Sequence, residues 1–213
     1  MNEDLKIKYL HNPCETLATA FWKEQWFTKP EGISISLDKD ITSDDSASNE
    51  GIRYFRLIHH LLECRKAALP DGYVFRNVLL PDEATLVADV INQCYDGYSQ
   101  TQENVLQWTK HPVFDNKLWI FICEANSSAP AALGIADFDP HIKEGSLEWI
   151  QVLPAHRGKG LGEALVLELL SRLKDTSGFV TVSGEVENAA NPERLYRKCG
   201  FTGDAVWVVN RRC

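Results

Sequence analysis

Along most of the chain, apolar residues recur either at every second position or at spacings of three and four. From residue 73 onward the two patterns alternate, which is typical of a domain that packs helices against a sheet. The alternating and β-branched stretches predict strands over 73–79, 118–124, 132–138, 147–152, 179–186 and 205–210. Helical spacing predicts helices over 83–94, 103–109, 162–174 and 192–199.

The first 72 residues have a different pattern and form a separate layer. They predict a short strand at 7–10, a helix over 16–26, a strand at 33–37 and a helix over 54–68. The acidic, serine-rich stretch 38–51 predicts a mobile loop, and a Pro-Asp-Gly turn closes the layer at residue 72. We therefore expect an N-terminal extension, 1–72, that packs on a core domain, 73–213.

The strongest local signal is a glycine-rich turn, Arg157-Gly-Lys-Gly-Leu-Gly162, between the strand at 147–152 and the helix at 162–174. Glycines allow backbone N–H groups to approach a phosphate closely, and a helix N-terminus adds partial positive charge. Arg157 and Lys159 add two full charges. The combination predicts an anion-binding cradle.

Two common phosphate-binding loops do not fit this turn. A P-loop needs Ser or Thr after its lysine, whereas Gly160 follows Lys159. A dinucleotide fingerprint needs a third glycine where Glu163 stands, and too little chain follows to complete a doubly wound sheet. A third pattern, Arg/Gln-x-x-Gly-x-Gly/Ala, matches at every position.

That loop, the preceding Leu147-Glu-Trp-Ile-Gln-Val-Leu-Pro154 and the later Asn191-Pro-Glu-Arg-Leu-Tyr-Arg-Lys-Cys-Gly-Phe201 stand in the order found in one family. Over about residues 73–213 the chain resembles the GCN5-related N-acetyltransferase (GNAT) family. The resemblance implies an α/β (α+β) fold. This fold is a mixed, mostly antiparallel GNAT-type sheet flanked by helices, here with an N-terminal α/β extension.

The resemblance also implies that the loop holds the pyrophosphate of acetyl-CoA, which is the co-substrate. The expected cofactor-binding residues are Val152, Arg157, Gly158, Lys159, Gly160, Leu161, Gly162, Asn188 and Asn191. The family's asparagine commonly lies a little further before the tyrosine than Asn191 does. Asn188 and Asn191 bracket that position, so both remain candidates for the residue that faces the cofactor.

Acetyl transfer to an amine needs a neutral amine, and an alkylammonium with a pKa of about 10.4 is almost fully protonated at neutral pH. Glu148 is the candidate general base. Strand alternation places it on the same face as Ile150 and Val152. It also has the spacing of the acidic residue in some relatives with small-amine substrates. Glu185 and Glu187 are the alternatives.

Tyr196 is the candidate general acid, because the family's tyrosine hydroxyl lies near the cofactor sulfur and a phenol can protonate the leaving thiolate. The oxyanion donor is expected to be a backbone N–H at or beside Val152. The acceptor pocket is expected from residues 94–117, where Tyr95, Tyr98 and Trp108 lie in a polar stretch typical of a pocket edge.

Charge, cysteine content and the N-terminal sequence bear on the binding partners, the metal content and the location of the protein. The chain has 213 residues and a net charge of −8, which argues against nucleic acid or an anionic membrane as the main partner. The six cysteines show no disulfide framework, and no His/Cys cluster has metal-ligand spacing, so no metal is expected. The N-terminus lacks the pattern of a signal peptide, so we expect a cytoplasmic protein.

These observations predict an acetyl-CoA-dependent N-acetyltransferase that moves an acetyl group directly to a primary amine of a small molecule or peptide. The alternative is a non-catalytic acyl-CoA-binding or regulatory module, which would not need Glu148 and Tyr196. A partner-binding role for residues 1–72 is a third hypothesis. The pattern leaves the oligomeric state open between a monomer and a homodimer.

Overall fold

The computed structural model describes residues 3–28, 30–41, 51–95 and 99–211. Its contacts group into two compact units, one of residues 1–60 together with 181–213 and one of residues 61–180. Most of the expected loop at 38–51 lies outside the described residues. Its described residues include the short 3-10 turn η1 (Asp38–Asp40).

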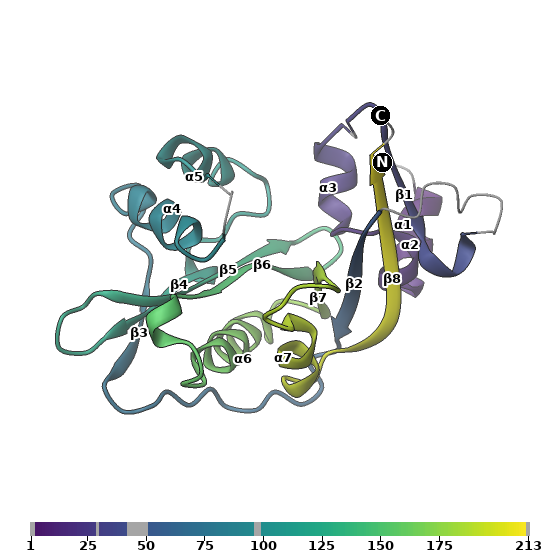
Figure 1. Cartoon of the computed structure of the whole chain (residues 1–213). Coiled ribbons are helices and arrows are strands. Elements are labelled where there is room, and N and C mark those ends of the chain that lie inside the picture. The colour runs from purple at the N-terminus through teal and green to yellow at the C-terminus, as the bar shows by residue number, and fades with distance from the viewer. Residues whose placement is uncertain (1–2, 29, 42–50, 96–98, 212–213) are drawn as a thin grey trace. The chain divides into compact units, whose positions relative to one another are not determined.

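The unit of residues 61–180 contains four antiparallel strands in the order β6-β5-β4-β3. Figure 1 shows helices α4 and α5 on one face of these strands and α6 on the opposite face. The strands are β3 (Tyr73–Asn77), β4 (Trp119–Glu124), β5 (Pro130–Asp139) and β6 (Glu144–Val152). The helices are α4 (Ala84–Asn92), α5 (Gln102–Trp108) and α6 (Leu161–Leu173), with 3-10 turns η3 (Asn116–Leu118) and η4 (Pro154–His156).

Helix α6 packs closely on the strands because two glycines leave room for its leucines. A Cβ on Gly134 of β5 would stand 3.1 Å from both Leu165 and Leu169, and one on Gly145 of β6 would stand 2.8 Å from Leu173. These three leucines are completely buried. Each contributes about 1.5–3 kcal/mol on burial, so this contact fixes where α6 begins relative to the end of β6.

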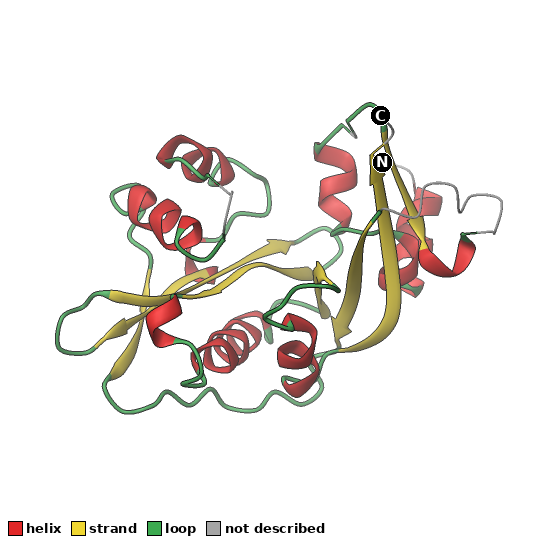
Figure 2. Cartoon of the chain, in the orientation of Figure 1, coloured by secondary structure: helices red, strands yellow, loops and turns green. Residues whose placement is uncertain are grey.

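The other unit contains β1, β8, β2 and most of β7, in that order, with β1 and β2 both antiparallel to β8. Figure 2 shows these strands with short helices around them. The strands are β1 (Ile33–Leu37), β2 (Ile52–His59), β7 (Phe179–Glu185) and β8 (Thr202–Arg211). The helices are α1 (Glu3–His11), α2 (Pro13–Thr16), α3 (Phe21–Trp26) and α7 (Pro192–Lys198).

From residue 73 onward every predicted strand and helix is confirmed within a few residues, and so is the strand at 33–37. The helix predicted over 54–68 is wrong, since residues 52–59 form strand β2. Phe55, Arg56 and Leu57 are buried in succession, so both faces of β2 are covered. A strand buried on both faces lacks the alternation that would distinguish it from a helix.

Two other N-terminal predictions need correction. Residues 7–10 belong to helix α1, in which Tyr9 is buried while Ile7 and Leu10 are exposed. Four residues are too few to separate a strand from a helix by periodicity. The helix expected over 16–26 is only partly present, because Leu17 is extended (φ −137°, ψ 144°) and α3 begins at Phe21.

Arg56 of strand β2 forms hydrogen bonds to both α1 and β7, and so connects the N-terminal and C-terminal parts of this unit. This buried guanidinium donates hydrogen bonds to the hydroxyls of Tyr9 (2.7 Å), Ser183 (3.0 Å) and Thr181 (3.2 Å). Such bonds offset part of the cost of burying a charge. The contacts thus group residues 1–60 with 181–213, whereas residues 61–72 join the other unit. The domain boundary at residue 72 stays a prediction.

His59, at the end of β2, gives this unit a pH-dependent stability. Its side chain is buried against Phe201, with ring centroids 5.3 Å apart. Burial lowers the pKa of His59, and His60 lowers it further, against an opposing backbone hydrogen bond with Cys199. The unfolded chain therefore binds this proton more readily than the folded protein does. Stability is full above the ordinary pKa of about 6.5 and is lost as pH falls below it.

As the pH falls from about 7 to about 5, we expect protonation of His59 to lower the free energy of unfolding by up to about 1.4 kcal/mol per pH unit. Chemical denaturation across this range measures the slope for the wild type and for His59→Gln, which should lose most of this contribution. His11→Gln, at an exposed position at the end of α1, is the control and should keep it. Equal slopes for wild type and His59→Gln would contradict the prediction.

Candidate active site

The glycine loop joins the end of β6 to the start of α6. Gly158 (φ +77°) and Gly160 (φ +82°) both adopt left-handed backbone conformations that side chains disfavour. A Cβ at either position would meet nothing within 4 Å. The two glycines are therefore required by the backbone, and they border open space rather than packed protein.

The same loop exposes the N-terminus of α6. The first N–H groups of the helix have no acceptor within it, and Gly160 at the N-cap offers no side chain to bind them. Glu163 lies in the first turn, where its charge would oppose an anion, but it pairs with Arg65 (Nη1–Oε1 3.1 Å). The start of α6 can therefore bind a negatively charged group.

The two cations of the loop are fixed by different partners. Arg157 donates from Nε to the Val152 carbonyl (3.2 Å), which also accepts from the Cys94 thiol (3.5 Å). Burial raises the pKa of Cys94 against the opposing effect of Arg157, so the thiol keeps its proton. This arrangement anchors the Arg157 side chain at the end of β6.

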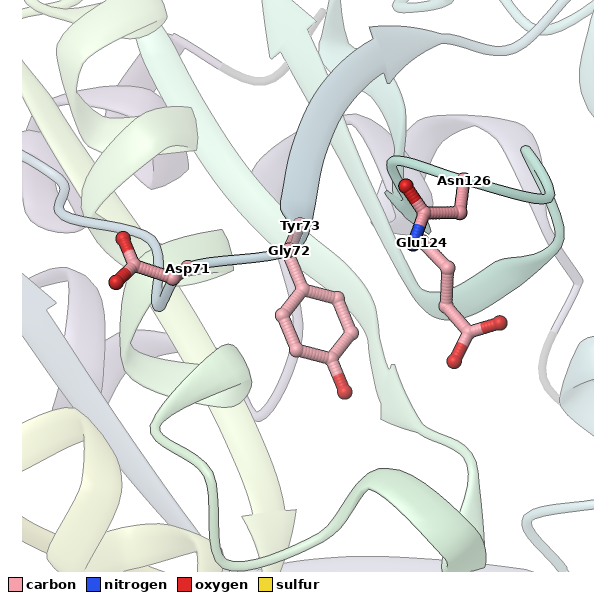
Figure 3. A pocket seen from close by; sticks show the side chains of 5 residues that line it. All are labelled: Asp71, Gly72, Tyr73, Glu124 and Asn126. Atoms are coloured by element: carbon pink, nitrogen blue, oxygen red, sulfur yellow. The ribbon is translucent and has the colours of Figure 1, made fainter.

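Lys159 is held by an aromatic residue that the sequence pattern did not identify as functional. Its Nζ lies 3.0 Å from the Tyr73 hydroxyl and 5.7 Å from the ring centroid. The same hydroxyl lies 2.9 Å from His156 Nδ1. Figure 3 shows the Tyr73 ring at the start of β3, where it lines a surface pocket of about 290 Å³ together with Asp71, Gly72, Glu124 and Asn126.

Glu148 occupies a β-bulge in β6, which breaks the alternation of side chains between Glu148 and Ile150. Leu147 pairs with Ala136 and Trp149 with Ile135, so Glu148 has no partner of its own in the ladder. Ser146 donates a hydrogen bond to Glu148 Oε1 (3.0 Å), which places the two side chains together. Bulges commonly redirect a side chain next to an active site.

The expectation that Glu148 shares a face with Ile150 and Val152 is wrong. Gly145 points at Leu173 of α6, so its neighbour Ser146 points away from α6, and Glu148 lies with Ser146. Ile150 pairs with Gly134, which points at α6. The half-buried carboxylate therefore lies on the α4–α5 face of the strands.

Two of the expected pocket aromatics meet on this same face at Trp149. The Trp108 ring stacks on Trp149 (centroids 5.6 Å apart, planes at 20°), and Tyr95 meets its edge at 6.1 Å. Gln151 donates to the Tyr95 hydroxyl (3.2 Å). Trp149 was missed as a site residue, although it follows Glu148 directly. Tyr98 lies outside the described residues.

The remaining candidates belong to the unit of residues 1–60 and 181–213. Tyr196 lies on α7 and is buried, with its ring 6.1 Å from Phe55 and 5.7 Å from Phe201. The Asn191 side chain caps α7 by accepting from the Arg194 N–H (3.3 Å), as expected for an N-cap. The Asn188 side-chain Oδ1 accepts from the Ala190 N–H (2.9 Å). The alternative bases Glu185 and Glu187 are exposed.

Within the ranges that the structure describes, no group of three or more His, Cys, Asp or Glu side chains is placed to hold a metal ion. No helix in the described part of the chain is long and apolar enough to cross a bilayer.

Comparisons with known proteins agree with this geometry. Residues 116–203, which include β4 to α7 and the glycine loop, match the model of the acetyltransferase (GNAT) domain. No curated protein matches the sequence. The matched segment, about two fifths of the chain, is therefore similar to a GNAT acetyltransferase domain, which confirms the resemblance inferred from the loop.

Solved structures share the fold at low sequence identity. A GCN5-related N-acetyltransferase from Sphaerobacter thermophilus superposes with a TM-score of 0.71 at 16% identity, over 89% of this chain and 63% of that one. A tandem GNAT protein of the clavulanic acid biosynthesis pathway gives 0.60 at 14% identity, over 84% and 62%. A GCN5-related N-acetyltransferase from Kribbella flavida gives 0.56 at 14% identity, over 84% and 67%. The chain thus spans less than two thirds of the first two structures, and the expected fold class is confirmed.

Proposed function

We propose that the protein is an acetyl-CoA-dependent N-acetyltransferase that acetylates a primary amine of a small molecule or peptide. The observation that carries this proposal is the loop between β6 and α6, with two left-handed glycines facing open space at a helix N-terminus. The GNAT domain match over residues 116–203 supports the same class of reaction.

The cofactor's pyrophosphate would accept hydrogen bonds from the backbone of the loop and the start of α6. Gly158, Gly160, Leu161 and Gly162 would supply backbone groups, and Arg157 and Lys159 would supply charge. Val152 would contribute a backbone N–H toward the developing oxyanion. Asn188 or Asn191 would contact the cofactor from the segment before α7.

Glu148 would act as the general base, directly or through water. It is half-buried, accepts one hydrogen bond from Ser146, and shares its face with Tyr95, Trp108 and Trp149. Aromatic faces attract ammonium groups, so this wall suits an amine that arrives as a cation and must then lose a proton. The acceptor would bind against these three rings.

Tyr196 would protonate the leaving thiolate of CoA, and the acetyl group would pass directly to the amine. The reaction needs no metal in this scheme. We also propose a cytoplasmic location, since none of the five cysteines that the structure describes forms a disulfide. The partners would be the amine substrate and the cofactor, without nucleic acid or membrane.

Acetyl-CoA should raise the melting temperature of the wild type, because a ligand that binds only the folded state adds about 2.7 kcal/mol of stability at a hundred times its Kd. Gly160→Val should fold yet lose this shift, because its side chain would stand in the open space that the pyrophosphate needs. Gly32→Val is the control, since Gly32 is also exposed and left-handed (φ +76°). A wild-type shift in melting temperature with acetyl-CoA in Gly160→Val would refute the proposal that the loop binds the pyrophosphate.

Glu148→Gln should lower the rate about a hundredfold near neutral pH, because the amide keeps the size of the side chain but cannot accept the proton. Raising the pH should restore much of the rate, since more of the amine is then neutral. CoA release across a pH series with a panel of amines measures this. Glu168→Gln, which removes a carboxylate paired with Arg172, is the control. Wild-type rates at every pH would make Glu185 the next candidate.

Tyr196→Phe should lower kcat about ten- to a thousandfold and leave acetyl-CoA affinity nearly unchanged. The ring keeps its packing against Phe55 and Phe201, so the melting temperature should stay close to the wild-type value. Tyr54→Phe removes a hydroxyl from β2 of the same unit and serves as the comparison. If turnover is normal, the Tyr196 hydroxyl is structural. If acetyl-CoA binds but no amine is acetylated, the binding-module alternative is favoured.

A further inference from the structure

We propose that Tyr73 is a positioning residue for the cofactor, because its hydroxyl holds the Lys159 ammonium at the glycine loop, ready to meet a phosphate group. The inference rests on the proposed function and adds a residue that lies outside the family's loop pattern. Tyr73 begins β3 and comes to the loop only through the fold.

Hydrogen-bond chemistry shows which atom donates and which accepts among Tyr73, His156 and Lys159. An ammonium can only donate, so the Tyr73 oxygen accepts from Lys159 Nζ (3.0 Å). The Tyr73 hydroxyl proton is then available to His156 Nδ1 at 2.9 Å, which makes that nitrogen the acceptor. Each member thus fixes the next, and Lys159 keeps two ammonium protons for another acceptor.

The charge around the loop points to an anionic acceptor. Among the described residues neither Lys159 nor Arg157 forms an ion pair, in contrast to Arg65, which neutralises Glu163. Both cations flank a helix N-terminus that is itself partially positive. Concentrated positive charge without carboxylate partners, in a chain of net charge −8, is best explained by a phosphate that arrives with the ligand.

A flexible lysine usually loses side-chain freedom when it binds, which weakens the interaction. Tyr73 removes part of this cost in advance, because its hydroxyl and its ring both restrain the ammonium. The ring stays in place in Tyr73→Phe, so this variant removes only the hydrogen bonds. The Tyr73 side chain is half-buried at the start of an edge strand, where the substitution leaves packing intact.

The test is a double-mutant cycle with acetyl-CoA affinity measured by calorimetry and kcat and KM measured in the acetylation assay. Tyr73→Phe should weaken acetyl-CoA binding about three- to tenfold, and Lys159→Met about tenfold or more. In the Lys159→Met background, Tyr73→Phe should have almost no further effect, because the group that it positions is absent. The KM for acetyl-CoA should rise in both single variants, with kcat nearly unchanged.

Lys8→Met on α1 removes one exposed positive charge elsewhere and controls for net charge. Additive effects of the two substitutions, or a Tyr73→Phe affinity equal to wild type, would overturn the proposal. If the wild type itself does not bind acetyl-CoA, the proposed function fails instead. Binding by the wild type with no role for Tyr73 leaves that function intact and removes only this inference.

Acetyl-CoA carries phosphate in its pyrophosphate and in its 3′-phosphate, and a second ligand separates them. Acetyl-dephospho-CoA lacks the 3′-phosphate. If Lys159→Met weakens both ligands equally, the cluster binds the pyrophosphate. If the effect disappears with acetyl-dephospho-CoA, the cluster binds the 3′-phosphate. Either result supports a positioned lysine, whereas no effect of Lys159→Met on either ligand would overturn it.

Discussion

The candidate site depends on the close approach of α6 to β5 and β6. Gly134 and Gly145 have no side chains, and the leucines of α6 fill the space that a Cβ would occupy. Because these leucines are fully buried, the helix cannot shift along the strands without opening the core. The first turn of α6 is therefore fixed at the end of β6, and the N–H groups proposed to bind the pyrophosphate are fixed with it.

In the unit of residues 61–180, positive charge and the candidate base lie in different places. The loop presents positive charge to open space through Arg157, Lys159 and the helix N-terminus. The opposite, α4–α5 face of the strands carries Glu148 beside stacked tryptophans, which suits a cation. The bulge at Glu148 breaks the alternation of β6, so that Ser146 and Glu148 lie on the α4–α5 face whereas Ile150 lies on the α6 face.

The sequence could predict the loop and the elements around it, because strand, glycine turn and helix are adjacent in the chain and each has a local signal. It could not predict the direction of Glu148, since a bulge is set by pairing with β5. Tyr73 and Trp149 were missed for a related reason, because their roles arise from neighbours brought together by the sheet. Strand β2 was mistaken for a helix because burial on both faces removes its alternation. Long-range pairing thus explains most of what local patterns missed.

The position of β2 has a consequence for how the protein is made. This strand lies between β7 and β8, which follow it by most of the length of the chain. During synthesis, residues 52–59 leave the ribosome long before residues 202–211 exist to pair with them. Phe55 and Leu57 then have no sheet to cover them, and such exposed segments tend to aggregate. The unit of residues 61–180 can complete its four strands earlier. It should therefore fold before the unit of residues 1–60 and 181–213.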